Sequence, residues 1–493
     1  MVALQNKNLR ENISKPIFYQ NEDVKWTSIK LSEVAEQKYR FEANVFNIES
    51  KHARELIKNS TYPLLNLFSG DSFIQSAIYP TRFKRIYVNK QDGIEFYMPS
   101  QLLEINPQPT KFISPKTKVN FEELKVNENE LLITRSGTIG NITLVSKTLA
   151  NRVFSDDVIR MRLYDDNDLG YVYSFLKTSI GQLLLKTNNY GSVINHIEPD
   201  HLSNIKVPNP SKKLKNQIDE LIKESFRLRD ESNELIETAR KILLTELDLP
   251  PIEDIEKEYF IRKDDIENFT VRSKNLSNRF DGSYHHPIVK EILKLLPKKS
   301  KEIKLLGDSE LSSNIILPGR FKRIYVEEDQ GAVFFGGKQI LELDPRDKKY
   351  LSLTKHSSRI QNELTIHEND ILITRSGTIG KVQITPKHWN SFVANEHIIR
   401  VVPSNSDIAG YLYTWLNTDY GYELIKRFTY GSVVDEIDNH QLARIQIPIL
   451  KDPNKIKEIN DSVLKANDLR SESYNLDQEA IKIVNEEIIY HGD

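Results

Sequence analysis

One ten-residue stretch occurs twice in the chain. Residues 131–140 read Leu-Leu-Ile-Thr-Arg-Ser-Gly-Thr-Ile-Gly, and residues 371–380 differ only in the first residue, an isoleucine. The two stretches start 240 residues apart in a chain of 493 residues, which is close to half its length. Chance does not produce a match of this length at this offset. The chain is therefore built from two copies of one plan.

Other motifs recur at almost the same offset. Each copy has a basic segment, Pro-x-Arg-Phe-Lys-Arg-Ile-Tyr-Val, at residues 80–88 and 318–326. Its β-branched and aromatic residues around a cluster of cations predict a short strand with a charged end. The stretches that follow these segments, residues 89–130 and 327–370, diverge strongly between the copies.

The repeated decamer predicts a buried strand followed by a tight turn, because three apolar residues precede a glycine-rich run. Both copies then carry Gly-Tyr-x-Tyr, beginning at Gly170 and Gly410, with apolar residues continuing at helical spacing. This spacing predicts one amphipathic helix in each copy. Each copy closes on a short apolar run that ends at Pro208 or Pro448, which predicts an edge strand.

Two long helices follow these edge strands. Apolar and small residues alternate in steps of three and four from Leu214 to Ile242 and again from Ile459 to Ile483. Such a heptad pattern predicts helices of ~35 residues, about 50 Å long. A long helix with one apolar stripe needs a partner, and a two-fold repeat predicts that the two helices pair in antiparallel fashion. Ser232 and Ser473 interrupt both stripes at the same place, which indicates a close approach or a fixed register.

The expected fold is therefore α/β (α+β), with mixed strands and helices in two globular domains that two long antiparallel coiled-coil-like helices join and separate. The predicted boundaries are 1–209 for the first globular domain, 210–249 for the first long helix, 250–450 for the second globular domain and 451–493 for the second long helix.

Composition excludes several classes of protein. There is no cysteine, so neither disulfides nor thiolate metal sites are expected. No run reaches the ~18 apolar residues that span a bilayer, and residues 1–20 lack the apolar core of a secretory signal. We therefore expect a cytoplasmic protein. The net charge of −2 does not exclude nucleic-acid binding, because a local surface can be basic on a neutral chain.

The sequence contains no convincing catalytic motif. Gly377 to Lys381 lacks the spacing of a phosphate-binding loop, and the first copy has Asn141 in place of Lys381. The eleven histidines show no metal-binding spacing, so no metal site is expected. A duplicated chain without these motifs favours recognition over catalysis. The alternatives are a helical protein–protein scaffold and a methylase or nuclease with an unrecognised site.

The order of these segments, the decamer and the Leu-x-x-Ile-x-Val-Pro ending at Pro208 resemble the specificity subunits of Type I restriction–modification systems, or the equivalent subunits of related methylation-linked defence complexes. The resemblance covers nearly the whole chain and names its globular parts target-recognition domains. It implies a subunit without catalytic activity that binds double-stranded DNA, each domain reading one half of a split, asymmetric target.

The same resemblance implies partners and cofactors. Two adenine methyltransferase (modification) subunits would dock on the long helices, with an ATP-driven restriction subunit as an optional further partner. S-adenosylmethionine and ATP would bind only in those partners, and no cofactor is expected in this chain. Because the two copies diverge, we expect two unlike half-sites.

The candidate DNA-binding residues fall into three groups. The cations of the basic segments could clamp phosphates or could form a solvated face; they are Arg82, Lys84, Arg85, Arg320, Lys322 and Arg323. Arg135 and Arg375 of the decamers could contact DNA, although an ion pair that supports the turn is favoured because both copies share it. The remaining candidates are Tyr190 and Tyr430, which could instead pack a turn, and the pair Asn195 and His196.

Asn195 and His196 align with Asp435 and Glu436 in the second copy. A pair that changes identity between two readers is what base readout requires, although drifting surface residues would give the same pattern. The candidate partner-binding or spacer residues share the apolar stripes of the long helices; they are Leu221, Leu228, Leu235, Leu469, Leu476 and Ile483.

Overall fold

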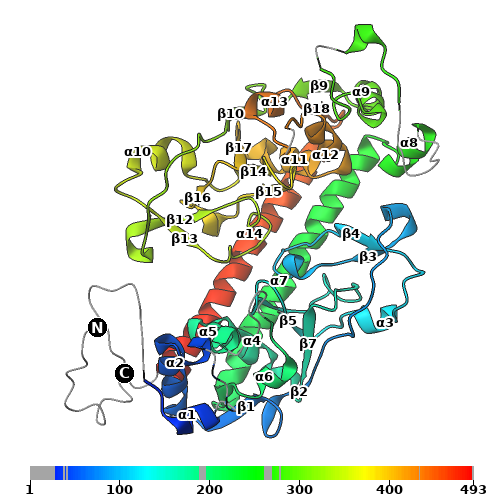
Figure 1. Ribbon diagram of the computed structural model, residues 1–493. Coiled ribbons are helices and arrows are strands. Elements are labelled where there is room, and N and C mark those ends of the chain that lie inside the picture. Colours follow the sequence, from blue (N-terminus) through cyan, green and yellow to red (C-terminus); the bar gives the residue numbers. More distant parts are fainter. Residues whose placement is uncertain are drawn as a thin grey trace, which may run out of the picture. The chain divides into compact units, whose positions relative to one another are not determined.

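The computed structural model describes the chain except for residues 1–27, 37–38, 40, 42, 188–195, 260–268, 277–278, 432–433 and 491–493 (Figure 1). Contacts divide the chain into two compact units. Unit 1 comprises residues 1–103, 107–226 and 475–493, and unit 2 comprises residues 104–106 and 227–474. Each unit therefore contains one globular part and one part of each long helix.

The main sheet of unit 1 has six strands in the order β6-β5-β7-β2-β1-β8. The strands are β1 (Leu64–Phe68), β2 (Ser72–Ile78), β5 (Leu131–Thr134), β6 (Ile142–Leu144), β7 (Val158–Leu163) and β8 (Lys206–Pro208). Neighbouring strands are antiparallel except β1 and β2. β8 lies at the edge and ends at Pro208, as predicted. A second, two-stranded sheet pairs β3 (Ile94–Phe96) with β4 (Lys111–Ile113).

The short helices of unit 1 surround these sheets. They are α1 (Leu31–Glu36), α2 (Ile48–Lys58), α3 (Phe121–Leu124), α4 (Leu169–Lys177), α5 (Ser179–Thr187) and α6 (Pro199–Leu202), with 3₁₀ turns η1 (Ala43–Phe46), η2 (Lys90–Asp92), η3 (Pro99–Gln101) and η4 (Asp166–Asp168). The prediction of one helix after Gly170 is wrong, because the chain forms two helices, α4 and α5. Thr178 ends the first, and its hydroxyl accepts a hydrogen bond from the Gly181 N–H at 3.0 Å. The apolar spacing continues across this N-cap and hides it.

Unit 2 repeats the strand order of unit 1. Its main sheet runs β10-β17-β14-β15, matching β2-β7-β5-β6, and β9 pairs with β18 as β1 pairs with β8. These strands are β9 (Glu302–Leu305), β10 (Ser312–Ile316), β14 (Ile371–Thr374), β15 (Val382–Ile384), β17 (Ile398–Pro403) and β18 (Gln446–Ile449). A third sheet has the order β11-β13-β12-β16. Its strands are β11 (Tyr325–Val326), β12 (Gly331–Phe335), β13 (Lys349–Ser352) and β16 (Val393–Ala394).

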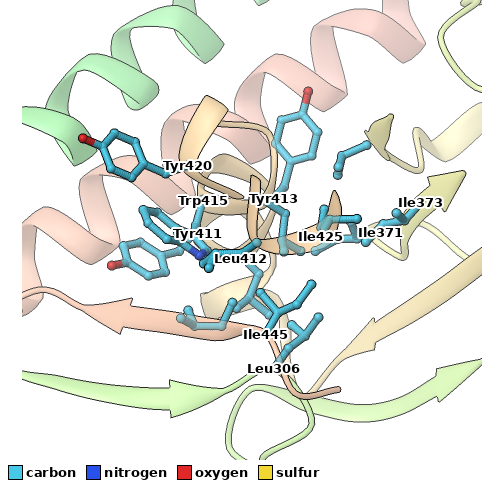
Figure 2. Close-up of a cluster of buried hydrophobic side chains, with 14 of the residues drawn as sticks. Leu306, Ile371, Ile373, Tyr411, Leu412, Tyr413, Trp415, Tyr420, Ile425 and Ile445 are labelled. Atoms are coloured by element: carbon cyan, nitrogen blue, oxygen red, sulfur yellow. The ribbon is translucent and has the colours of Figure 1, made fainter. Parts of the chain in front are cut away.

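Helices of unit 2 pack around these sheets. They are α8 (Ile252–Tyr259), α9 (Pro287–Lys299), α10 (Ser357–Arg359), α11 (Ser406–Leu416), α12 (Asp419–Lys426) and α13 (Asn439–Leu442), with short turns η5 (Ser273–Asn275), η6 (Glu328–Gln330), η7 (Ile360–Leu364) and η8 (Lys387–Trp389). The core gathers around α11, whose Tyr411 and Trp415 are fully buried (Figure 2). Ile371 and Ile373 of the second decamer belong to the same cluster, so the repeated motif builds the core directly.

The two long helices are α7 (Lys212–Glu246) and α14 (Pro453–Ile483), and α14 continues into a π-helical turn, η9 (Val484–Ile489). They run antiparallel within unit 2. Arg229 donates to Ser473 at 2.8 Å, and further along α7 Asn233 accepts from Arg470, which precedes Ser473. Within unit 1, Ser225 donates to Asp477 at 2.8 Å.

Along the middle of these helices, Leu228 and the two serines of the predicted seam are buried, but two of its leucines are not fully buried. These are Leu469 and Leu476, which are only half-buried. Buried polar side chains occupy the interface there instead, and Ser232 and Ser473 are both fully buried. The apolar residues toward the helix ends pack into the two cores: Leu221 and Ile483 contact the core of unit 1, and Leu235 that of unit 2. A heptad pattern predicts which face of a long helix is buried, but it does not predict that the globular parts cover that face.

One contact docks each long helix on its unit in the same way. The N–H of Gly170, which opens α4, donates to the Asp219 carboxylate of α7 at 2.9 Å. The N–H of Gly410 in α11 donates to the Asn460 side chain of α14 at 2.8 Å. A Cβ on either glycine would lie 2.5–2.6 Å from the backbone of the long helix, so only glycine fits. These docking residues, Asp219 and Asn460, were not predicted from the sequence.

Candidate nucleic-acid interface

The two basic segments, residues 80–88 and 318–326, have the same alternation of exposed and inward-facing side chains. In unit 1, Arg82 and Lys84 are exposed, whereas Phe83 and Arg85 turn toward the unit. In unit 2, Arg320 and Lys322 are exposed in the same way. The predicted short strand is present only at the end of the second segment, where Tyr325 and Val326 form β11 and pair with β13, whereas Tyr87 in the first segment makes a single bridge to Ile113. Exposed and inward-facing side chains therefore alternate along these segments without a continuous partner strand.

Each basic segment ends with an exposed aromatic residue. Tyr87 and Tyr325 are 48% and 42% exposed, and each ring lies against a lysine of the adjacent strand. The Lys111 ammonium is 5.6 Å from the Tyr87 ring centroid, and that of Lys349 is 5.2 Å from the Tyr325 ring. Each unit thus presents exposed cations and an aromatic ring along one short segment.

The third cation of each segment points inward. Arg85 pairs with the buried carboxylate of Asp156 and lies 3.6 Å from that of Asp157. Burial lowers the pKa of Arg85, but the hydrogen bond and charge of Asp156 outweigh it and raise the pKa above its ordinary value. Arg323 pairs with Glu396, whose side chain is only 6% exposed. Arg85 and Arg323 are therefore held by the fold, apart from the exposed cations.

The repeated decamer forms the same hairpin in both units, as predicted. β5 and β6 are joined by a turn in which Gly137 and Gly140 have φ of 75° and 83°. Gly377 and Gly380 adopt the same left-handed conformation between β14 and β15. The hydroxyl of Thr134 closes the turn by accepting from the Asn141 N–H at 3.1 Å. Glycine is required at these positions because other residues resist positive φ.

The arginine of each decamer is ion-paired, which agrees with the interpretation favoured for it. Arg135 pairs with Glu198, lies 3.7 Å from Asp157, and covers the Tyr79 ring at 4.2 Å. The side chain of Glu198 also raises the pKa of Tyr79, chiefly through a hydrogen bond.

Arg375 donates to Glu436 at 2.7 Å and to the Ile437 carbonyl at 3.0 Å. Its guanidinium also lies 3.5 Å from the Tyr430 hydroxyl. Each arginine thus ties the decamer turn to the segment that precedes α6 or α13.

The structure brings some of the remaining candidates to this turn. His196 forms a backbone bridge with Ser136, and Glu436 forms the matching bridge with Ser376, which supports their alignment. Tyr430 is 40% exposed beside Glu436. Tyr190 and Asn195 lie outside the described residues. The neighbours Asp157 and His397 were not predicted, although their constant offset of 240 residues from one another is visible in the sequence.

One cluster in unit 2 has the residue types of a nucleophilic site. Ser376 Oγ lies 2.7 Å from His397 Nδ1. His397 Nε2, however, is 3.9 Å from the nearest Glu396 oxygen, beyond hydrogen-bond reach. Glu396 is moreover occupied by Arg323. The orienting bond of a catalytic triad is therefore missing, and the cluster fits polar recognition better.

The part of the chain that the structure describes lacks two further features. In that part, no group of three or more histidine, aspartate or glutamate side chains is arranged to hold a metal ion. None of its helices combines the length and apolar character needed to cross a bilayer.

Comparison with known proteins assigns the class. Residues 327–476 match the family described as the Type I restriction modification DNA specificity domain. No curated protein sequence matches the chain.

Two solved structures illustrate the likeness. The S subunit of a Type I restriction–modification system from M. genitalium is 14% identical, with 86% of this chain and 94% of that chain covered and a TM-score of 0.30. The HsdS subunit from Thermoanaerobacter tengcongensis is 13% identical, with 85% and 97% covered and a TM-score of 0.25.

The matched residues include the second decamer, and the first decamer lies in the same hairpin and strand order in unit 1. The region that the family match identifies as a DNA specificity domain is therefore the second of two copies of one fold. Residues 327–476 thus belong to the family of Type I restriction modification DNA specificity domains.

Proposed function

We propose that each unit reads one half of a split, asymmetric DNA target, and that the chain itself carries out no catalysis. The observation that carries this proposal is the basic segment, which has the same exposed cations in two units whose neighbouring residues differ. Contacts to phosphates position a protein on DNA without reading sequence, so shared cations suit that task. Base readout requires residues that differ between two unlike half-sites.

Arg82 and Lys84 in unit 1, and Arg320 and Lys322 in unit 2, are the proposed phosphate contacts. Each carries one charge on an exposed side chain, and Tyr87 or Tyr325 lies at the end of the same segment. Arg85 and Arg323 would support these segments from behind through their buried ion pairs. Cations that release counterions from phosphates make binding strongly dependent on salt.

The long helices would set the number of unread base pairs between the two halves and would dock two adenine methyltransferase subunits. Each helix has residues in both units, which supports a role in spacing. Half-site separation in a two-part reader follows from the geometry of its connection. S-adenosylmethionine would bind in the methyltransferase subunits, and ATP in an optional restriction subunit. Leu469 and Leu476 are the half-buried seam residues that remain partly available on α14.

Methylation mapping tests this function. The chain is co-expressed with the methyltransferase subunit encoded beside it, and methylated adenines are located across the host DNA. The expected result is one target with two unlike halves at a fixed spacing. A continuous target, or methylation that does not require this chain, would contradict the proposal. The chain purified alone should transfer no methyl group from S-adenosylmethionine, and transfer by it would contradict its non-catalytic role.

A further inference from the structure

Two matched positions beside the decamer turns exchange an acid and a histidine between the units. Position 157 in unit 1 corresponds to 397 in unit 2, and position 196 corresponds to 436. Unit 1 has Asp157 and His196, whereas unit 2 has His397 and Glu436. The correspondence is structural as well, because the N–H of Arg135 bonds to the Asp157 carbonyl and that of Arg375 to the His397 carbonyl.

The exchange leaves the decamer arginine paired in both units. In unit 1, the Arg135 guanidinium lies near Asp157 and pairs with Glu198. In unit 2, the carboxylate comes from Glu436 instead. The counterpart of Glu198 there is Asp438, which caps α13 by accepting from the Gln441 N–H at 2.7 Å. The fold therefore needs a carboxylate beside this arginine but does not dictate which position supplies it.

The exchange changes the groups that the site offers at its surface. The side chains of Asp157 and Glu436 are 20% and 19% exposed, and that of His397 is 40% exposed. His196 is half-buried and bridges Ser136 of the same turn. A carboxylate accepts hydrogen bonds, as from the amino group of cytosine, whereas a neutral imidazole offers both a donor and an acceptor.

These positions border the two basic segments. Asp157 lies 3.6 Å from Arg85 of the first basic segment. Glu436 lies 3.4 Å from Arg320 of the second, and that arginine is 72% exposed. A strand of DNA held by the exposed cations of either segment would therefore run next to the exchanged pair of that unit.

We propose that these exchanged pairs, Asp157 with His196 and His397 with Glu436, determine which base each unit selects next to its phosphate contacts. The inference rests on the proposed function and adds the residues that make the two half-sites unlike. The arginine and the glycine turn stay the same, so the scaffold is constant and the hydrogen-bonding groups on it vary.

The test transplants the pair of unit 2 into unit 1. The double substitution Asp157→His with His196→Glu keeps Glu198 for Arg135 and places a second carboxylate where unit 2 has Glu436. Methylated targets are mapped as for the natural chain. We expect one half of the target to change its preferred base, with roughly tenfold lower methylation of the original sequence. The other half and the spacing should stay the same.

The reciprocal substitution, His397→Asp with Glu436→His, should alter only the other half. Lys84→Ala is the matched control, which should reduce methylation at all sites without changing the target sequence. An unchanged target in both double variants would overturn the inference. Failure of the natural chain to give a split target would instead overturn the proposed function.

If the double variant of unit 1 gives no methylation, the single variant His196→Gln tests the inference in its place. It leaves both carboxylates beside Arg135 in place and changes only the donor and acceptor pattern at that position. Altered or broadened base preference in the same half supports the inference, and a target identical to that of the natural chain overturns it.

Discussion

Neighbouring arginines and lysines of the basic segments have different tasks. Arg323 is turned toward Glu396, and its guanidinium lies 5.3 Å from the Phe334 ring centroid. Lys322, one residue earlier, is exposed. Burying a carboxylate is unfavourable unless a cation compensates for it, so Arg323 stabilises the fold whereas Lys322 remains available for DNA. The same division separates Arg85 from Lys84 in unit 1.

Arg323→Ala should destabilise unit 2 by about 3 kcal/mol, because it leaves the Glu396 carboxylate buried and unpaired. The measurement is denaturant unfolding followed by tryptophan fluorescence. Two of the three tryptophans, Trp389 and Trp415, are buried in unit 2, so most of the signal reports on that unit. Lys322→Ala is the control and should change stability by less than about 0.5 kcal/mol. Equal stability of the two variants would show that the buried pair is not needed.

At the scale of elements, each long helix docks through the N–H of a glycine in a domain helix. Gly410 donates to Asn460, and its Cα approaches the backbone of α14 closely. A hydrogen bond and a close steric fit thus hold α14 at the same residue of α11. Because the arrangement recurs at Gly170 and Asp219, both units use it to fix a long helix against the core.

Gly410→Ala should destabilise unit 2 by about 1–3 kcal/mol, the usual effect of overpacking. The new Cβ would lie 2.6 Å from the Asn460 carbonyl oxygen, so backbone would have to move. Gly282→Ala, with no atom within 4 Å of the new Cβ, is the matched control. The same fluorescence-detected unfolding measures both. A Gly410→Ala variant as stable as Gly282→Ala would mean that α14 docks elsewhere.

A second contact holds α14 on unit 2 and is sensitive to pH. The His388 ring stacks on Tyr474 of α14 at 4.2 Å, and its Nε2 lies 2.8 Å from the Leu343 carbonyl oxygen. Burial lowers the pKa of His388 to about 4, although the Leu343 hydrogen bond acts in the opposite direction. The unfolded chain, with a histidine pKa of about 6.5, then binds a proton that the folded unit excludes.

Unit 2 should therefore keep the full contribution of His388 above pH ~6.5 and lose it as the pH falls toward 4. The loss between pH 6.5 and 5 is about 2 kcal/mol for this one group. His388→Gln should make the decline in stability between pH 7.5 and 5 smaller by that amount. His440→Gln, an exposed histidine of the same unit, should leave the decline as it is. Parallel declines in all three proteins would contradict the assignment to His388.

The sequence was most informative where structure is local. The decamer predicted a strand and a glycine turn, and both are present because the required backbone angles depend on Gly137 and Gly140 themselves. It could not show that Arg85 turns inward, since Asp156 lies 71 residues away. Nor could it separate α4 from α5, because the Thr178 cap preserves the helical spacing of apolar residues. The sequence located Ser232 and Ser473 in the middle of the helix pair but not the buried polar side chains around them, because these bond to distant segments; Asn233, for example, donates to the Ile105 carbonyl.

At the scale of the whole molecule, charge is concentrated where the proposed function needs it. The net charge of −2 gives the chain no general attraction to DNA, so binding must depend on local cations. Many arginines and lysines of the described residues are committed to ion pairs, as Arg135, Arg375 and Arg400 are. The two basic segments expose Lys84 and Lys322 at matched positions. Two separate units that hold one DNA molecule should therefore contribute equal and independent salt-dependent terms.

Lys84→Ala and Lys322→Ala should each lower the slope of the logarithm of affinity against the logarithm of salt concentration by about one. The double variant should lower it by about two, because the substitutions lie in different units. The measurement is binding of the assembled complex to a duplex that carries the mapped target, between about 50 and 200 mM salt.

A duplex with one half of that target scrambled separates the two units. If both units grip one DNA molecule, each substitution acts on the intact target and the effects add. If only one unit binds at a time, the double variant would lower the slope by about one and not two, and reading a split target with both units at once would be excluded. Because phosphates are contacted whatever the sequence, each single substitution should also weaken binding to unrelated DNA, which distinguishes these lysines from the residues that select bases.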